Sequence, residues 1–154
     1  MDLTITLKGA SEDFARQVLA MFVGAEGVVV STEPADTEWT ADRAYRLLRM
    51  TNARSLLLID TAVNGNGWVD GPAYRKEFGE QALRGPSATI TKAIKRGAAE
   101  GLWSSDIPHP LRATTPAPGQ GWSKTGGYFL DAKHLPVFRT AMERYAQDSA
   151  AREK

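Results

Sequence analysis

Basic and hydroxyl side chains gather between residues 84 and 96, and these residue types suit contacts with a polyanion. Lys92, Lys95 and Arg96 lie within five residues of one another, and Thr89 and Thr91 come just before them. Lysine and arginine neutralise phosphates, whereas hydroxyl groups donate to phosphates or to base edges. The full set of candidate nucleic-acid contacts is Arg75, Lys76, Arg84, Ser87, Thr89, Thr91, Lys92, Lys95, Arg96, Arg112 and Lys124. These residues predict a surface that binds nucleic acid.

Residues for catalysis or metal binding are sparse. The chain has no cysteine, and its two histidines are His109, between two prolines, and His134. Neither histidine has a metal-ligand spacing, and no motif surrounds a serine or threonine nucleophile. A calcium loop over 64–70 is excluded because Ala62 and Ala73 stand where its first and last carboxylates belong. We therefore expect no enzyme activity, no metal and no cofactor.

Charge is divided unevenly along the 154 residues. The net charge of +1 combines two basic and eight acidic residues in 1–42 with 17 basic and 10 acidic residues in 43–154. This asymmetry indicates an anion-binding body with an acidic appendage, and residues 1–42 are also a candidate contact for a protein partner. Because there is no apolar run of ~20 residues, no signal-peptide pattern and no cysteine, we expect a cytoplasmic protein without a membrane segment.

The cations are positioned by a helix that the sequence predicts over 86–102. Pro86 suits the first helical turn and Gly101 suits the end. At about 100° per residue, Ile90, Ala93 and Ile94 gather on one side and the lysines on the other. Taken alone, this pattern is more typical of an ordinary amphipathic surface helix whose charges are solvated, and the elements before and after the helix favour the binding interpretation.

Two segments precede this body. Residues 1–31 predict an acidic strand-helix-strand extension, with strands at 2–8 and 28–30 and a helix between Ser11 and Gly24. Residues 32–39 are polar and contain a proline, which predicts a linker.

The remaining chain, residues 40–147, predicts one domain followed by a frayed tail at 148–154. Capping residues, apolar periodicity and Gly/Pro-rich turns define the boundaries of its elements. The expected elements are helices over 41–50, 53–63, 71–78, 86–102 and 131–147, and strands at 68–69, 111–115 and 128–130.

This order resembles that of winged helix-turn-helix DNA-binding proteins, and broadly that of bacterial regulators of the multiple-antibiotic-resistance type. The resemblance is carried by the segments 56–63, 68–69, 71–78, 86–102 and 111–130. It implies an α+β fold, a winged helix-turn-helix with the N-terminal strand-helix-strand extension and a C-terminal helix. It also implies that helix 86–102 enters the major groove and that the hairpin 111–130 is the wing. The N-terminal extension and the long turn at 79–85 depart from that family.

The leading hypothesis is a sequence-specific double-stranded DNA-binding protein, a transcriptional regulator that acts as a homodimer. An apolar stripe on the last helix predicts the dimer interface, because a terminal stripe is often completed by a second copy. Its residues are Leu135, Phe138, Met142 and Tyr145. The alternative is a protein-interaction module on the same scaffold, in which the basic face docks an acidic partner, since a fold alone does not decide function. A third hypothesis, binding of structured or single-stranded nucleic acid, has less support because few aromatic residues are placed for base stacking.

Overall fold

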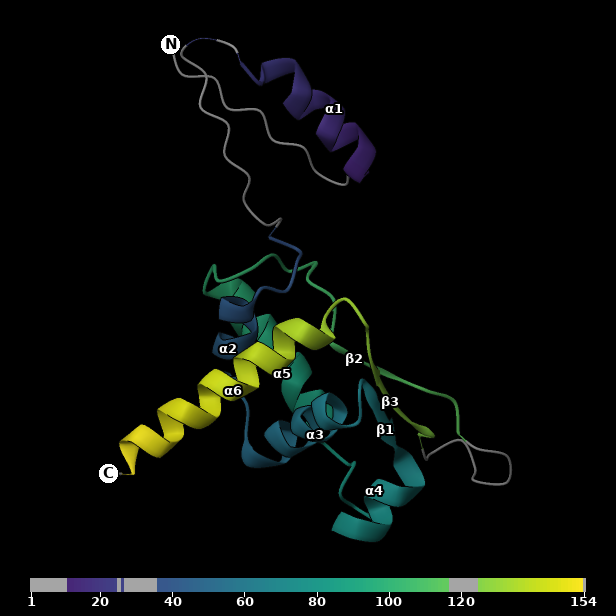
Figure 1. The fold of residues 1–154 in the computed structure, drawn as a ribbon. Helices are drawn as coiled ribbons and strands as arrows, with labels where there is room; N and C mark the ends of the chain where they lie inside the picture. Colours follow the sequence, from purple (N-terminus) through teal and green to yellow (C-terminus); the bar gives the residue numbers. More distant parts are fainter. Residues whose placement is uncertain (1–10, 25, 27–35, 117–124, 154) are drawn as a thin grey trace. The chain divides into compact units, whose positions relative to one another are not determined.

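The computed structural model describes residues 11–24, 26, 36–116 and 125–153. The chain divides into two units, Met1–Ala35 and Asp36–Lys154 (Figure 1). In the first unit, helix α1 (Glu12–Phe22) begins where Ser11 Oγ accepts a hydrogen bond from the backbone N–H of Phe14. The strands expected at 2–8 and 28–30 lie outside the described residues.

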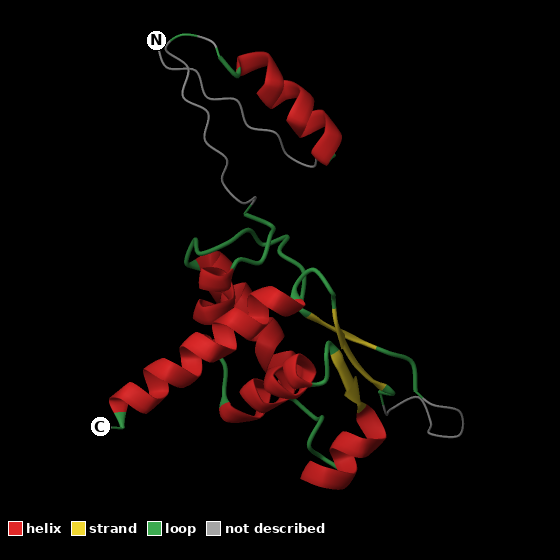
Figure 2. Cartoon of the chain, in the orientation of Figure 1, coloured by secondary structure: helices red, strands yellow, loops and turns green. Residues whose placement is uncertain are grey.

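The second unit is α+β, as the sequence predicts, with helices on a small antiparallel sheet (Figure 2). Its helices are α2 (Ala41–Met50), α3 (Ala53–Asn64), α4 (Gly71–Phe78), α5 (Pro86–Ala99) and α6 (Leu135–Arg152). Its strands are β1 (Trp68–Asp70), β2 (Leu111–Ala113) and β3 (Gly127–Leu130). The order of elements therefore follows the expected one.

Side-chain caps begin three of these helices at the predicted positions. Thr40 Oγ1 accepts from the N–H of Arg43, Asn52 Oδ1 from that of Ser55, and Asp70 Oδ2 from that of Ala73. Each cap satisfies a backbone donor that has no partner within its own helix. Local sequence therefore places the starts of α2, α3 and α4.

Strand β3 lies between β1 and β2, and both neighbours pair with it antiparallel. Val69 of β1 lies opposite Tyr128 of β3, and both side chains are buried on the core side of the sheet. Trp68 lies opposite Phe129 on the other side, where each is 41% exposed. The alternation follows from the two-residue period of a strand.

The core joins α2 and α6 to α3 and α5. Trp39, just before α2, contacts the rings of Trp103 and Phe138 at centroid distances of 5.5 Å. Leu58 of α3 and Ile90 of α5 are fully buried in the same cluster. Helix α5 is thus packed on its inner side against the centre of the domain.

Three elements differ from their sequence-based bounds by more than one residue. Helix α5 ends at Ala99 instead of 102, because Gly101 has a φ of 76° and Leu102 N–H bonds back to Gly97 O. Strand β2 ends at Ala113. Helix α6 begins at Leu135, after a turn, and continues to Arg152, so the expected frayed tail is helical over 148–152.

Candidate nucleic-acid interface

Helix α5 has one buried and one exposed side. Ile90, Ala93, Ile94 and Gly97 are buried. The exposed side carries a row of residues spaced three or four apart, which we call the α5 stripe. It consists of Arg84, just before the helix, and of Ala88, Lys92, Lys95 and Ala99.

Three features hold α5 in place. Ser55 Oγ of α3 donates to Pro86 O at 3.0 Å within the core. The indole Nε1 of Trp103 donates to Ile94 O at 2.9 Å, so the chain after α5 folds back onto it. Gly97 leaves room for that indole, since a Cβ there would lie 2.0 Å from Trp103 Cζ2. The α5 stripe is therefore displayed by a tightly packed helix.

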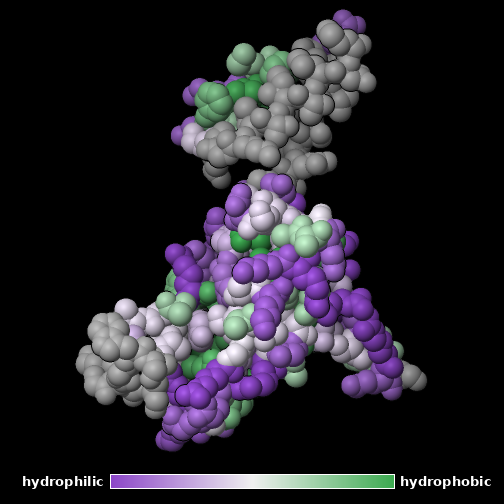
Figure 3. All heavy atoms as spheres, turned by 180° about the vertical axis from the view of Figure 1, so that it is seen from behind, coloured by the Kyte–Doolittle hydropathy of each residue, from purple (hydrophilic) through white to green (hydrophobic). Residues whose placement is uncertain are grey.

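The two lysines of the α5 stripe are exposed, and within the described part of the chain neither forms an ion pair. Arg84 and Lys76 are also exposed. The face of this unit seen in Figure 3 is covered largely by hydrophilic residues. Lysines in this state can neutralise phosphates without first breaking an ion pair.

Three arginines of the candidate set have partners within the protein. Arg75 is 6% exposed and donates to Thr125 O at 2.6 Å, which ties α4 to the start of the returning strand. The expectation that Arg75 contacts DNA is therefore corrected, because its guanidinium is buried. Arg96 donates to Met50 O, the end of α2, at 2.9 Å. Arg112 pairs with Asp131 at 2.5 Å while remaining largely exposed.

The hydroxyl candidates line the two sides of the α5 stripe. Ser87, Thr89 and Thr91 are each partly exposed. Thr91 Oγ1 donates to Ser87 O at 3.1 Å, within the helix itself. Lys124 lies outside the described residues, in the loop between β2 and β3.

His109 links the start of α5 to β2. Leu111 N–H donates to its Nδ1 at 3.1 Å, so the proton must lie on Nε2, which is 3.2 Å from Ser87 O. Burial lowers the pKa of His109 and favours this neutral form. Sequence reasoning found no role for this residue, because one of its two partners, Ser87 O, lies 22 residues earlier in the chain.

The hairpin approaches the start of α4 closely. Gly71 N–H donates to Gly126 O at 3.0 Å, and a Cβ on Gly71 would lie 2.7 Å from Thr125 O. Together with Arg75, this contact fixes the base of the β2–β3 hairpin beside α4.

No protein-family model, curated protein or solved structure matches this chain. Its own residues are therefore the basis for inferring its function. Among the described residues, no three histidine, aspartate or glutamate side chains are grouped so that they could hold a metal ion. None of the described helices combines the length and the hydropathy of a membrane span.

The apolar stripe on α6 does not form the expected free surface. Phe138 is fully buried against α2 and Trp39 within one chain, so its assignment to a dimer interface is corrected. Leu135, Met142 and Tyr145 are partly buried and pack against the same core. The apolar stripe of α6 is therefore covered by the core of the same chain.

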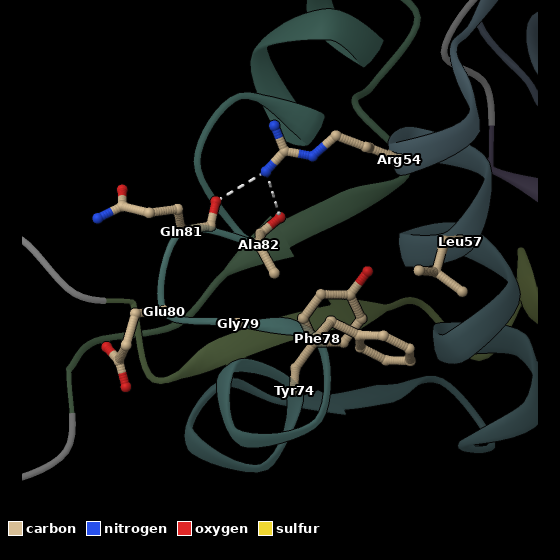
Figure 4. A pocket seen from close by; sticks show the side chains of 8 residues that line it. All are labelled: Arg54, Leu57, Tyr74, Phe78, Gly79, Glu80, Gln81 and Ala82. Carbon is tan, nitrogen blue, oxygen red and sulfur yellow. Dashed lines mark hydrogen bonds between the residues drawn. The ribbon is translucent and has the colours of Figure 1, made fainter.

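A groove of about 470 Å³ lies between α3 and the turn after α4. Figure 4 shows Arg54 reaching across it to the backbone of that turn, where Nη2 donates to Gln81 O and Ala82 O at 2.8 and 3.3 Å. Its apolar wall includes Leu57, 37% exposed, and Phe78, 41% exposed. Sequence reasoning assigned no role to this groove.

A second hollow, of about 430 Å³, is lined by arginines of α2 and α6. Asp42 accepts from Arg46 at 3.0 Å and from Arg144 at 3.3 Å, and the bond from Arg46 lowers the pKa of Asp42. The Arg144 guanidinium also lies 3.9 Å from the Tyr45 ring centroid. Two of these arginines are thus engaged within the chain.

Proposed function

We propose that this protein binds double-stranded DNA and acts as a transcriptional regulator, with a winged helix-turn-helix arrangement over α3 to β3. In this proposal α5 lies in the major groove and the β2–β3 hairpin is the wing. The order of elements and the antiparallel sheet are compatible with such an arrangement.

The α5 stripe is the observation that carries this proposal. A recognition helix needs a side that can approach base edges and neighbouring cations that can reach phosphates. Ala88 provides a short side chain early in α5, and Arg84, Lys92 and Lys95 provide exposed cations along the same side. The opposite side is anchored through Ile90 and Ile94 in the core.

The test is to remove the two lysines together and measure binding to a duplex selected from a random pool. We expect Lys92→Ala/Lys95→Ala to weaken binding at least roughly tenfold, about 1.4 kcal/mol. The slope of log affinity against log salt should flatten by about 0.9 for each phosphate that the variant no longer neutralises. Thermal unfolding should be unchanged, because both side chains are exposed. Arg96 is left intact since it bonds to the end of α2.

The matched control is Arg139→Ala/Arg152→Ala, which removes two exposed cations from α6. If both double variants weaken binding equally, the effect reflects net charge and the interface at α5 is refuted. If the wild-type protein selects no duplex at low salt, DNA binding itself is refuted.

The groove beside α3 favours a second candidate, a protein-interaction module that binds its partner through this groove and not through the basic face of α5. Exposed apolar side chains at Leu57 and Phe78 are typical of protein contacts, whereas duplex DNA offers chiefly phosphates and base edges. Under this alternative, Phe78→Ser would abolish capture of a partner protein and Lys92→Ala/Lys95→Ala would not.

A further inference from the structure

The segment 86–95 of α5 offers methyl groups and no amide, carboxylate or guanidinium side chain. Residues 86–95 contain no asparagine, glutamine, arginine, aspartate or glutamate. The usual side-chain pairings with adenine and the arginine pairing with guanine are therefore missing from this segment. Within this segment, a guanine edge could be contacted by the two lysines or by a single hydrogen bond from a hydroxyl group.

Ala88 and Thr91 are the side chains best placed to contact bases. Ala88 is exposed in the first turn of α5, at the centre of the exposed side, and Thr91 follows one turn later on its flank. The hydroxyl of Thr91 is engaged with Ser87 O, so its Cγ2 methyl is the unbonded end of the side chain. Alanine and threonine methyls are suited to the C5 methyl group of thymine.

The spacing of these residues fits neighbouring base pairs. Three residues span about 4.5 Å of helix, and successive base pairs are about 3.4 Å apart. The short side chains at Ser87, Ala88 and Thr91 also allow the backbone of α5 to come close to the groove floor, while Arg84 and Lys95 are long enough to reach outward to phosphates.

We infer that α5 distinguishes its duplex chiefly by thymine methyl groups, which Ala88 and Thr91 contact, and that Lys92 and Lys95 hold phosphates or a guanine edge. This inference rests on the proposed DNA binding and names the feature of DNA that the same site recognises.

The experiment uses the full chain and a duplex selected from a random pool. Each thymine of the selected site is replaced in turn by deoxyuridine, which removes only the C5 methyl group. We expect affinity to fall about fourfold at one or two adjacent positions, the value for one buried methyl-sized group. Thr91→Ser removes the protein methyl and keeps the hydroxyl bond to Ser87 O, and it should cost a similar factor.

The losses of affinity caused by the deoxyuridine replacement and by Thr91→Ser should not be additive. On the duplex that lacks the contacted methyl, Thr91→Ser should have almost no further effect, because its partner is already absent. The matched control is Thr140→Ser on α6, whose exposed hydroxyl makes the same type of bond, to Pro136 O at 3.1 Å. It should change neither affinity nor the deoxyuridine profile.

Two failures can be told apart. If the selected duplex binds with unchanged affinity after every deoxyuridine replacement, or if Thr91→Ser costs the same on both duplexes, the thymine inference is overturned while DNA binding stands. If no duplex binds at all, both the proposed function and this inference are refuted.

Discussion

Gly97→Ala tests whether α5 is held as tightly as the packing indicates. Helix propensity alone predicts stabilisation, since alanine is favoured over glycine inside a helix by about 1 kcal/mol. The structure predicts the opposite, because the added Cβ would lie 2.0 Å from Cζ2 and 2.5 Å from Cε2 of the buried Trp103. Either the indole or the backbone of α5 must move.

The size of the effect follows from what happens to Trp103. Forcing a methyl group into a packed core costs about 1–3 kcal/mol. Displacing the indole also separates Nε1 from Ile94 O, and an unsatisfied buried donor costs about 1–3 kcal/mol. After the propensity gain is subtracted, we expect the free energy of unfolding to fall by about 3 kcal/mol, within about 1–5 kcal/mol.

Urea unfolding followed by far-ultraviolet circular dichroism measures this change. Trp103→Phe is the companion variant, because the smaller ring lacks the atoms that the new Cβ would meet. In that background Gly97→Ala should cost at least ~1 kcal/mol less, a coupling that a double-mutant cycle isolates. An increase in stability for Gly97→Ala alone would refute tight packing of α5 on the indole, and additive effects would show that Trp103 is not the obstacle.

Two further predictions concern Phe138 and His109. Phe138→Ala should lower the free energy of unfolding by about 3–5 kcal/mol, as for a large core truncation, and leave the sedimentation coefficient of the folded protein unchanged. A folded variant that changes its oligomeric state instead would restore the α6 stripe as an interface. Because burial lowers the pKa of His109, the unfolded chain binds its proton more strongly, and stability should fall as pH drops below about 6.5 toward the folded pKa. His109→Gln should reduce this dependence of the unfolding free energy on pH, measured by urea titrations at about pH 7.5 and about pH 5.5. The remaining dependence would include that of His134, whose pKa is also lowered by burial. An unchanged dependence would show that protonation of His109 does not destabilise the fold.

Much of the fold could be predicted because it depends on local signals. Thr40, Asn52 and Asp70 are caps whose partners lie three residues away. Sequence alone therefore identifies Thr40 and Asp70, and it narrows the cap of α3 to Thr51 or Asn52. The buried side of α5 could likewise be predicted from its period. The strands could be predicted from the alternation of apolar and polar residues and from the turn before Trp68, where Asn66 and Gly67 adopt positive φ.

The fate of individual cations could not be predicted in this way. Arg75 and Lys76 are adjacent in sequence, yet Arg75 is buried and donates to Thr125 O, whereas Lys76 is exposed. The difference depends on a carbonyl 50 residues further along the chain, which no local pattern contains. A cluster of basic residues therefore predicts a charged region and does not say which members are free to bind a ligand.

Amphipathic patterns carry a related ambiguity. The period of Leu135, Phe138 and Met142 shows that one side of α6 must be buried, but the same period would result whether a second copy or the chain's own α2 covers it. Here α2 and Trp39 lie against α6 and bury Phe138 completely. On α5 the ambiguity is smaller, because the core already occupies its apolar side and the α5 stripe remains exposed. An exposed row of cations and methyl groups on a rigid helix is what a binding partner must match, and for that reason Lys92, Lys95 and Thr91 are the residues on which the proposed function should first be tested.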